Sequence, residues 1–231
     1  MRTEDVLDLE IATSTRTADT RIQKDVLVEW RTELSQWTTC DAFRTRIDNL
    51  ADGIPRNTFF RQAGLTFMRD AWIASRVASA LSSDMVRLIA SDRPDFEIRI
   101  GSHILQFEAT EADIEGRRRG DEPDDPHPRM DPVENWRKRF EAIPSALDRV
   151  VAKKIEKDYA PEVNLVIYLN LGCYGAYVEE GLPIIQDRTE AARNKFKSVY
   201  VLWEGELYKF WENGSSVFEK WTYVSIEDFS P

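Results

Sequence analysis

Apolar residues recur at helical spacing through the first ninety residues of the chain. Residues 65–90 have the strongest such pattern, which predicts a helix with a break near Ser82–Ser83. The run ADGIPRN at 51–57 separates it from an earlier helical stretch at 26–50, and the SDRP run ends it, because a residue before proline avoids the α region. The apolar positions of the earlier stretch are Val28, Leu34, Trp37, Phe43, Ile47 and Leu50.

Strict alternation of apolar and polar residues replaces the helical pattern at 93–113. Two alternating runs flank Gly101–Ser102, a pair that suits a two-residue type II′ turn, so the sequence predicts a β-hairpin. The turn sets the register and gives each face its members. The apolar face carries Phe96, Ile98, Ile100, Leu105, Phe107 and Ala109. The polar face carries Asp95, Glu97, Arg99, Gln106, Glu108 and Thr110.

The second half of the chain alternates between helical and strand patterns. A polar, proline-rich loop at about 115–132 precedes a predicted helix at 133–157, which contains Pro144. A continuous apolar run at 163–172 predicts a strand buried on both faces. A short helix near 187–196, a strand at 198–203 and strands at LYKFW and WTYVSI complete the pattern.

This order of elements predicts one α/β domain built around a mixed sheet. We divide the chain into a partly helical N-terminal extension at 1–64, packed on the core, and an α/β core at 65–231 with a flexible loop at about 115–132. The 231 residues, 42% of them hydrophobic, suffice for a substantial buried core.

Composition narrows the location and the partners of the protein. The chain has no apolar run near 18 residues and no apolar stretch at its start, so we expect neither a membrane span nor a secretory signal. Its two cysteines lack the spacing of a disulfide framework or zinc site, which favours the cytoplasm. The net charge of −10 disfavours a broad basic face for nucleic acid but is compatible with a local basic groove.

The predicted register places two carboxylates opposite each other, those of Asp95 and Glu108. Like charges at such positions repel, so a positive group is expected between them. Mg²⁺ or Mn²⁺ would fit, with Glu97 as a third carboxylate, since a hard cation takes one or two carboxylates and keeps several waters. The alternative is a structural or regulatory protein in which Arg93 or Arg99 reaches the pair.

Pro94–Asp95 and Glu108, with a helix before them and a helix and buried strand after them, resemble the PD-(D/E)xK nuclease superfamily. The resemblance covers about residues 65–172. It implies a restriction-endonuclease-like fold, with Asp95 and Glu108 as Mg²⁺ ligands and metal-dependent hydrolysis of phosphodiester bonds in DNA. Members that cut both strands are often dimers, so the resemblance is compatible with a homodimer.

The chain departs from the family at one position. The family has a lysine two residues after the second acidic residue, where this chain has Thr110. Gln106 and Thr110 could hold a water molecule by hydrogen bonds, and Arg137 or Lys138 could supply the missing charge. Lys154 is expected to be a lysine at the edge of the apolar stripe, because it lies about 30 Å along the helix from the start.

Because Thr110 replaces the family's lysine, two functions remain compatible with this fold. One is a nuclease whose site comprises Asp95, Glu108, Gln106 and Thr110. The other is a catalytically inactive nuclease-fold domain that acts as a nucleic-acid or protein interaction module. A cation within reach of Thr110 would distinguish the first from the second.

Overall fold

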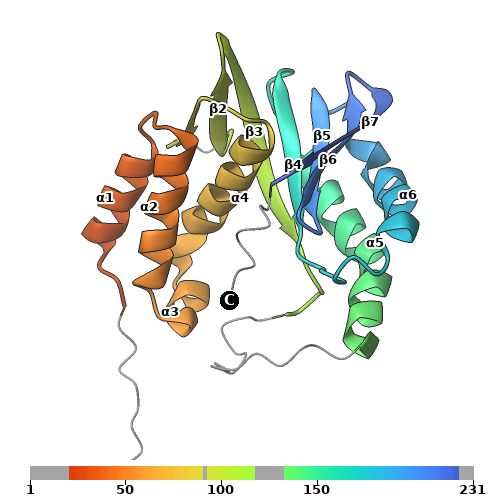
Figure 1. Cartoon of the computed structure of the whole chain (residues 1–231), viewed down its shortest axis with the longest axis horizontal. Coiled ribbons are helices and arrows are strands. Elements are labelled where there is room, and N and C mark those ends of the chain that lie inside the picture. Colours follow the sequence, from red (N-terminus) through yellow and green to blue (C-terminus); the bar gives the residue numbers. More distant parts are fainter. Residues whose placement is uncertain (1–20, 91–92, 118–132, 224–231) are drawn as a thin grey trace, which may run out of the picture.

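The protein folds into three layers, with a mixed β-sheet between two layers of helices (Figure 1). The computed structural model describes residues 21–90, 93–117 and 133–223. The predicted loop at 115–132 lies outside the described residues from 118 onward, as does most of the loose segment expected at 1–25. The strands are β1 (Met85–Leu88), β2 (Phe96–Ile100), β3 (His103–Ala112), β4 (Val163–Leu169), β5 (Ser198–Trp203), β6 (Glu206–Glu212) and β7 (Ser215–Thr222).

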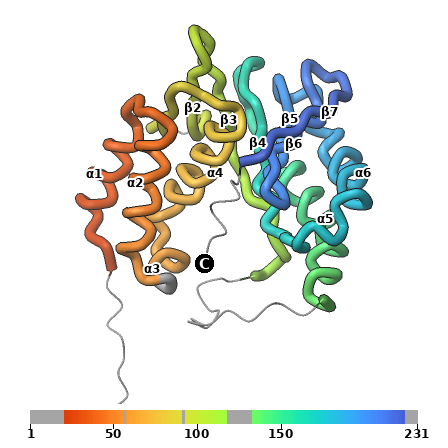
Figure 2. Tube along the Cα trace, in the orientation of Figure 1, coloured from red at the N-terminus to blue at the C-terminus, as the bar shows by residue number. Residues whose placement is uncertain are grey.

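The seven strands lie in the sheet in the order in which they occur in the chain. The colours of the trace accordingly pass in sequence across the sheet, from yellow-green to blue (Figure 2). β3, β4 and β5 are parallel, and the strands on either side of them pair antiparallel. The predicted mixed α/β architecture is therefore confirmed.

Helices cover the two faces of the sheet and bury one apolar core on each. On one face, α4 (Thr66–Ala80) packs against β1 and β2, with α2 (Cys40–Asp52) behind it. On the other, α5 (Val133–Ile155) and α6 (Val178–Thr189) lie beside each other and cover the parallel strands (Figure 1). The remaining helical segments are α1 (Lys24–Leu34), α3 (Arg56–Arg61) and the 3₁₀ turns η1 (Ala63–Leu65) and η3 (Glu190–Ala192).

The hairpin has the predicted register. Ile100 pairs with His103 and Phe96 with Phe107, which places the two-residue turn at Gly101–Ser102. β4 is buried along almost its whole length, as the apolar run predicted. Pro144 lies inside α5, which continues past it to Ile155.

Two predicted helices were wrong in extent. The helix predicted at 65–90 ends at Ala80, and Met85–Leu88 forms β1 instead. Ser82 takes a positive φ of 50° at the break, which no helix can contain. The helix predicted near 187–196 is α6, which starts earlier at Val178, and only a 3₁₀ turn follows it.

The C-terminal patterns correspond to β6 and β7, although β7 starts before the predicted WTYVSI run. The end of that run, at 224–226, lies outside the described residues. Among the helices that the structure describes, none is both long and apolar enough to cross a membrane.

Candidate functional site

The site lies where β3 continues past the end of its neighbour. The pairing of β3 with β2 ends at Phe107, whereas the pairing with β4 continues to Ala112. The far half of β3 therefore has one edge without a strand, and its backbone groups there need other partners. Because this edge faces the gap between the two helical layers, side chains from both layers can reach it.

Two charged side chains satisfy the backbone of Ala109 on this edge. The Asp95 carboxylate accepts a hydrogen bond from the Ala109 amide at 2.7 Å. The Lys154 ammonium donates to the Ala109 carbonyl at 2.8 Å. Asp95 directly precedes β2, and Lys154 belongs to the last turn of α5. The hydrogen bonds that a neighbouring strand would make to Ala109 are thus made by the side chains of Asp95 and Lys154.

Glu108 lies beside this pair and is only 3% exposed. Its Oε1 atom accepts hydrogen bonds from Lys154 Nζ at 2.6 Å and from the Tyr159 hydroxyl at 3.1 Å. Burial, followed by the neighbouring Glu108 charge, raises the pKa of Tyr159, so the phenol remains a donor. Oε2 of Glu108 is buried without a hydrogen-bond partner in the described part of the chain. A buried carboxylate oxygen in this state requires an explanation, and a bound cation is one that fits.

A third carboxylate, that of Asp70 on α4, completes the cluster. Burial raises the pKa of Asp95 to about 7, with the charges of Asp70 and then Glu108 as further causes. The Ala109 amide and Lys154 act against this rise. Asp70 itself forms an ion pair with Arg69 at 2.8 Å. Sequence analysis missed Asp70, because nothing in the pattern of α4 shows which turn faces Asp95.

The cluster holds more negative than positive charge. Three carboxylates, Asp95, Glu108 and Asp70, meet two cations, Lys154 and Arg69. Within the described residues, no three histidine, cysteine or acidic side chains are already arranged around an ion position. Mg²⁺ requires fewer protein ligands than that, since one or two carboxylates and several waters are enough. The unpartnered Glu108 oxygen, and the excess of negative charge when all three carboxylates are ionised, both fit such an ion.

The structure places the other predicted site residues differently. Thr110 follows Ala109 and lines the cleft described below. Glu97 and Gln106 form a separate cluster. Gln106 Nε2 donates to Glu97 Oε1 at 2.9 Å, and Arg87 donates from Nε and Nη2 to Oε2 of the same carboxylate at 2.9 and 2.7 Å. The Glu97 carboxylate is therefore already neutralised by an arginine, unlike Glu108.

The arginines weighed as structural partners of the acidic pair make other contacts. Arg93 donates to the carbonyl of Asp158 at 3.2 Å and lies 5.6 Å from the ring centre of Tyr159. Arg99 lies over the ring of Trp37. Lys154 pairs with Glu108 at 2.6 Å, and its positive charge also acts to lower the pKa of Asp95.

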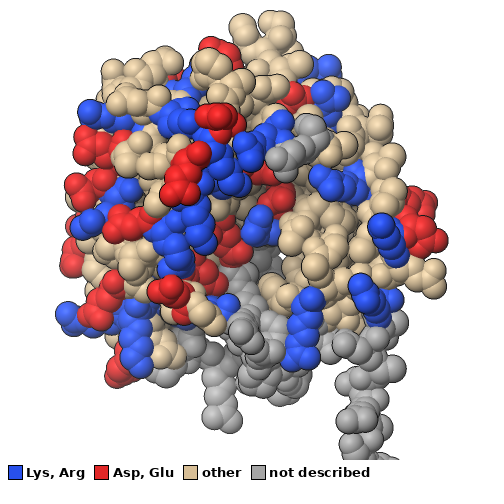
Figure 3. Space-filling model, turned by 180° about the vertical axis from the view of Figure 1, so that it is seen from behind, with Lys and Arg blue, Asp and Glu red and all other residues tan. Residues whose placement is uncertain are grey.

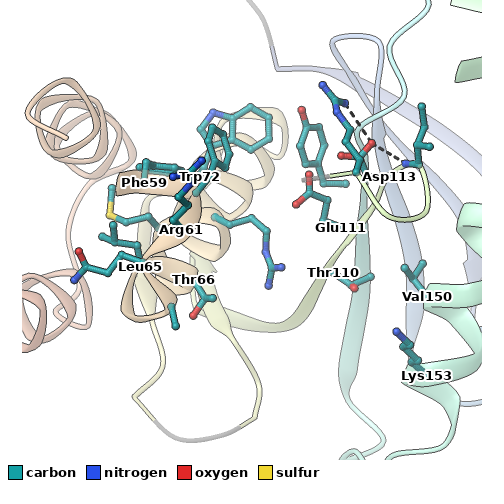
Figure 4. Close-up of a pocket in the computed structure, with 18 of the residues that line it drawn as sticks. Phe59, Arg61, Leu65, Thr66, Trp72, Thr110, Glu111, Asp113, Val150 and Lys153 are labelled. Atoms are coloured by element: carbon teal, nitrogen blue, oxygen red, sulfur yellow. Dashed lines mark hydrogen bonds and ion pairs between the residues drawn. The ribbon is translucent and has the colours of Figure 1, made fainter. Parts of the chain in front are cut away.

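A cleft of about 1380 Å³ lies next to the cluster and is lined by its two cations, Lys154 and Arg69, but not by its three carboxylates. Figure 4 shows Phe59, Arg61 and Trp72 on one side of it and Val150 and Lys153 of α5 on the other. Thr110, Glu111 and Asp113, from the unpaired end of β3 and the residue after it, lie between the two walls (Figure 4). Lys154 and Arg69 border both the cleft and the carboxylate cluster.

The expectation for Lys154 was wrong, and the topology explains why. The distance from the start of α5 is irrelevant, because a helix that joins two parallel strands runs back across the sheet. Its end must lie near the start of β4, where Val163 pairs with Gln106 and Leu165 with Glu108. The end of α5, which carries Lys154, therefore lies near Glu108 and not far from it.

The two basic residues proposed at the start of α5, Arg137 and Lys138, lie elsewhere. Arg137 pairs with Glu141 one turn along the same helix, and Lys138 is exposed. Neither is among the residues that line the cleft, as far as the structure describes it.

The chain matches no protein-family model, no curated protein and no solved structure. We therefore infer its function from the chemistry of the cluster itself.

Proposed function

We propose that the protein is a metal-dependent nuclease with a restriction-endonuclease-like fold, which hydrolyses phosphodiester bonds in DNA. One observation carries the proposal: Lys154 reaches from α5 to within 2.6 Å of Glu108 and bonds the carbonyl of Ala109, next to Thr110. The cation that the strand lacks at Thr110 is thus supplied by a helix. Asp95, Glu108 and Lys154 together provide the three side-chain types that the resemblance requires.

Asp95 and Glu108 are the residues that would hold Mg²⁺ or Mn²⁺, with Asp70 close enough to add its negative charge. Glu108 offers its unpartnered Oε2, and Asp95 offers the oxygen that does not bind the Ala109 amide. When bound, the ion supplies a water of lowered pKa and stabilises the charge that develops on the phosphate.

Lys154 would orient the reacting groups. An ammonium has three N–H donors, and two of them are used on Glu108 and Ala109. The third is left for a water or a phosphate oxygen, beside the carboxylates. Tyr159 donates to the same Glu108 oxygen as Lys154, and the two hydrogen bonds would hold the carboxylate in place before substrate arrives. Preorganisation of this kind lowers the cost of reaching the transition state.

The inactive interaction module was the alternative because the chain has Thr110 at the family's lysine position. The contacts of Lys154 with Glu108 and Ala109 bring a cation next to Thr110, which favours the nuclease over that alternative.

A cleavage assay tests the proposal. Wild-type protein with Mg²⁺ or Mn²⁺ should cut fluorescently labelled DNA, offered both single-stranded and duplex, and EDTA should stop the reaction. Asp95→Asn and Lys154→Met should each lower the rate by about a hundredfold or more. Lys220→Met, which removes a lysine from β7 far along the sheet, should leave the rate unchanged.

The proposal fails if neither form of DNA is cut under any of these conditions. It fails equally if the cutting activity survives in Asp95→Asn and Lys154→Met, since the activity would then come from a contaminant.

A further inference from the structure

The cleft beside the cluster has two walls of different chemistry. One wall is basic and comes from the last turns of α5, and the other is aromatic and comes from α3, α4 and β4. We propose that the cleft binds single-stranded nucleic acid and delivers it to the cluster. This inference rests on the proposed nuclease function and names the class of its substrate.

The basic wall follows one side of the end of α5. Arg149, Lys153 and Lys157 are four residues apart, a spacing that aligns side chains along a helix, and Lys157 lies just past the helix end. The Arg149 side chain is fixed by a 2.6 Å hydrogen bond from Nη2 to the carbonyl of Asp113. Lys153 and Lys157 are exposed and form no ion pair or side-chain hydrogen bond with any described residue. Their charges are available to phosphate groups.

The opposite wall presents aromatic rings. Phe59 and Phe60 pack edge to face with ring centres 5.2 Å apart, and Phe60 is 40% exposed. Trp72 packs on Tyr168 at 4.7 Å, at the level of the β4 residues beside Thr110 and Glu111. Phe60 is the exposed ring among these, whereas Phe59, Trp72 and Tyr168 are half-buried. An exposed ring can stack on bases of any sequence.

The two walls suit a single strand better than a duplex. Bases in a duplex are stacked on each other, so their faces cannot reach Phe60, whereas a single strand has faces to offer. The cleft volume of about 1380 Å³ also exceeds the usual range of small-molecule pockets, roughly 300–1000 Å³, so a polymer segment fits better than a metabolite.

The charge of the cleft differs in sign from that of the whole chain. Seven basic and four acidic side chains line it as described, while the protein carries a net charge of −10. On the face shown in Figure 3, basic and acidic side chains are intermingled. A duplex, with one charge per about 1.7 Å of its axis, would meet repulsion outside so narrow a basic region. A single strand can stay within it.

Binding in EDTA separates this inference from the cleavage reaction. Fluorescence anisotropy at low salt would compare the full chain with labelled oligo-dT, oligo-U and a blunt DNA duplex of the same length. We expect the single strands to bind at least tenfold more tightly than the duplex. The dT and U arms decide between DNA and RNA as the natural strand.

Matched variants test each wall. The double variant Lys153→Ala/Lys157→Ala should weaken single-strand binding. The slope of log K against log salt concentration should become less steep by about 0.7 for each lost phosphate contact. The double variant Lys24→Ala/Lys220→Ala makes the same change of charge outside the cleft and should change neither quantity. Phe60→Leu should weaken binding about fivefold. Phe218→Leu removes a ring that is 58% exposed on β7, and it should have no effect.

Three results would overturn the inference: equal or tighter binding of duplex, no binding of any strand, or cleft variants that behave like their controls. In each case the proposed nuclease function is tested separately, by the assay that measures cleavage of duplex and single-stranded DNA in the presence of metal. Single-strand binding at the cleft without any cleavage would support the inference on binding and contradict the nuclease.

Discussion

Asp95 shows how one residue links the stability of the fold to its chemistry. Its carboxylate holds the edge of β3 through the Ala109 amide, yet burial and two further carboxylates raise its pKa from 3.8 to about 7. Between these two values the folded state binds a proton that the unfolded state has released. Wild-type protein therefore loses stability as the pH rises from about 4 to about 7.

Asp95→Asn should remove this pH dependence. The amide oxygen of asparagine can still accept the Ala109 hydrogen bond, but it does not titrate. In EDTA, the stability of the variant relative to wild type should increase from pH 5 to pH 8 by on the order of 2 kcal/mol. Urea denaturation at the two pH values measures the difference. If the free energies of unfolding of the two proteins change with pH in the same way, the pKa of Asp95 is not raised in the metal-free fold.

Lys154→Met should destabilise the protein, because it leaves the buried Glu108 carboxylate without its cation. Removal of one partner of a buried pair costs about 3–5 kcal/mol. Adding Glu108→Gln to this variant should restore part of the loss, since the unpaired charge is then absent. A double-mutant cycle by urea denaturation gives the coupling. Additive effects of the two substitutions would mean that the pair contributes little in solution.

At the scale of elements, much of the hairpin could be predicted because its determinants are local. The Gly101–Ser102 turn and the alternation beside it fix which residues face each other. β1 was missed because Met85–Leu88 continues the helical spacing of α4, and only its pairing with β2 makes it a strand. Lys154 and Asp70 depend on how α5 and α4 lie across the sheet, which local patterns do not contain.

A lysine moved from α5 to β3 should partly replace Lys154. Thr110 lies two residues after Glu108, on the same face of the strand, so a lysine there can reach the same carboxylate. The double variant Thr110→Lys/Lys154→Met should cleave DNA at least ten times faster than Lys154→Met alone. Adding Thr110→Met to Lys154→Met is the matched control and should recover none. Equal rates in both double variants would show that Lys154 is not needed as a cation.

The packing of α6 on β5 rests on a glycine. A Cβ atom on Gly181 would lie 2.4 Å from the ring of Trp203, which is 1% exposed. Gly181→Ala should therefore destabilise the protein by about 1–3 kcal/mol, although alanine favours a helix. Gly172→Ala, whose Cβ meets nothing closer than 3.8 Å, should be close to neutral. Thermal unfolding of both variants compares the two, and a stabilised Gly181→Ala would contradict the packing.

For the molecule as a whole, the two helical layers serve one site. α4 brings Asp70 and part of the aromatic wall, and α5 brings Lys154 and the basic wall. The edge of β3 lies open between them because β2 starts only at Phe96, opposite Phe107. The net charge of −10 is compatible with this arrangement, because the basic side chains that matter are confined to the cleft.

The most direct test of the metal site is a calorimetric titration of Mn²⁺ into the protein at pH 8 and low salt. We predict that wild type binds about one ion, that Asp95→Asn and Glu108→Gln lose this binding, and that Glu97→Gln and the surface control Asp187→Asn keep it. If wild type binds no ion, or if Asp95→Asn binds as wild type does, the cluster is a structural ion pair and the metal-dependent mechanism is wrong.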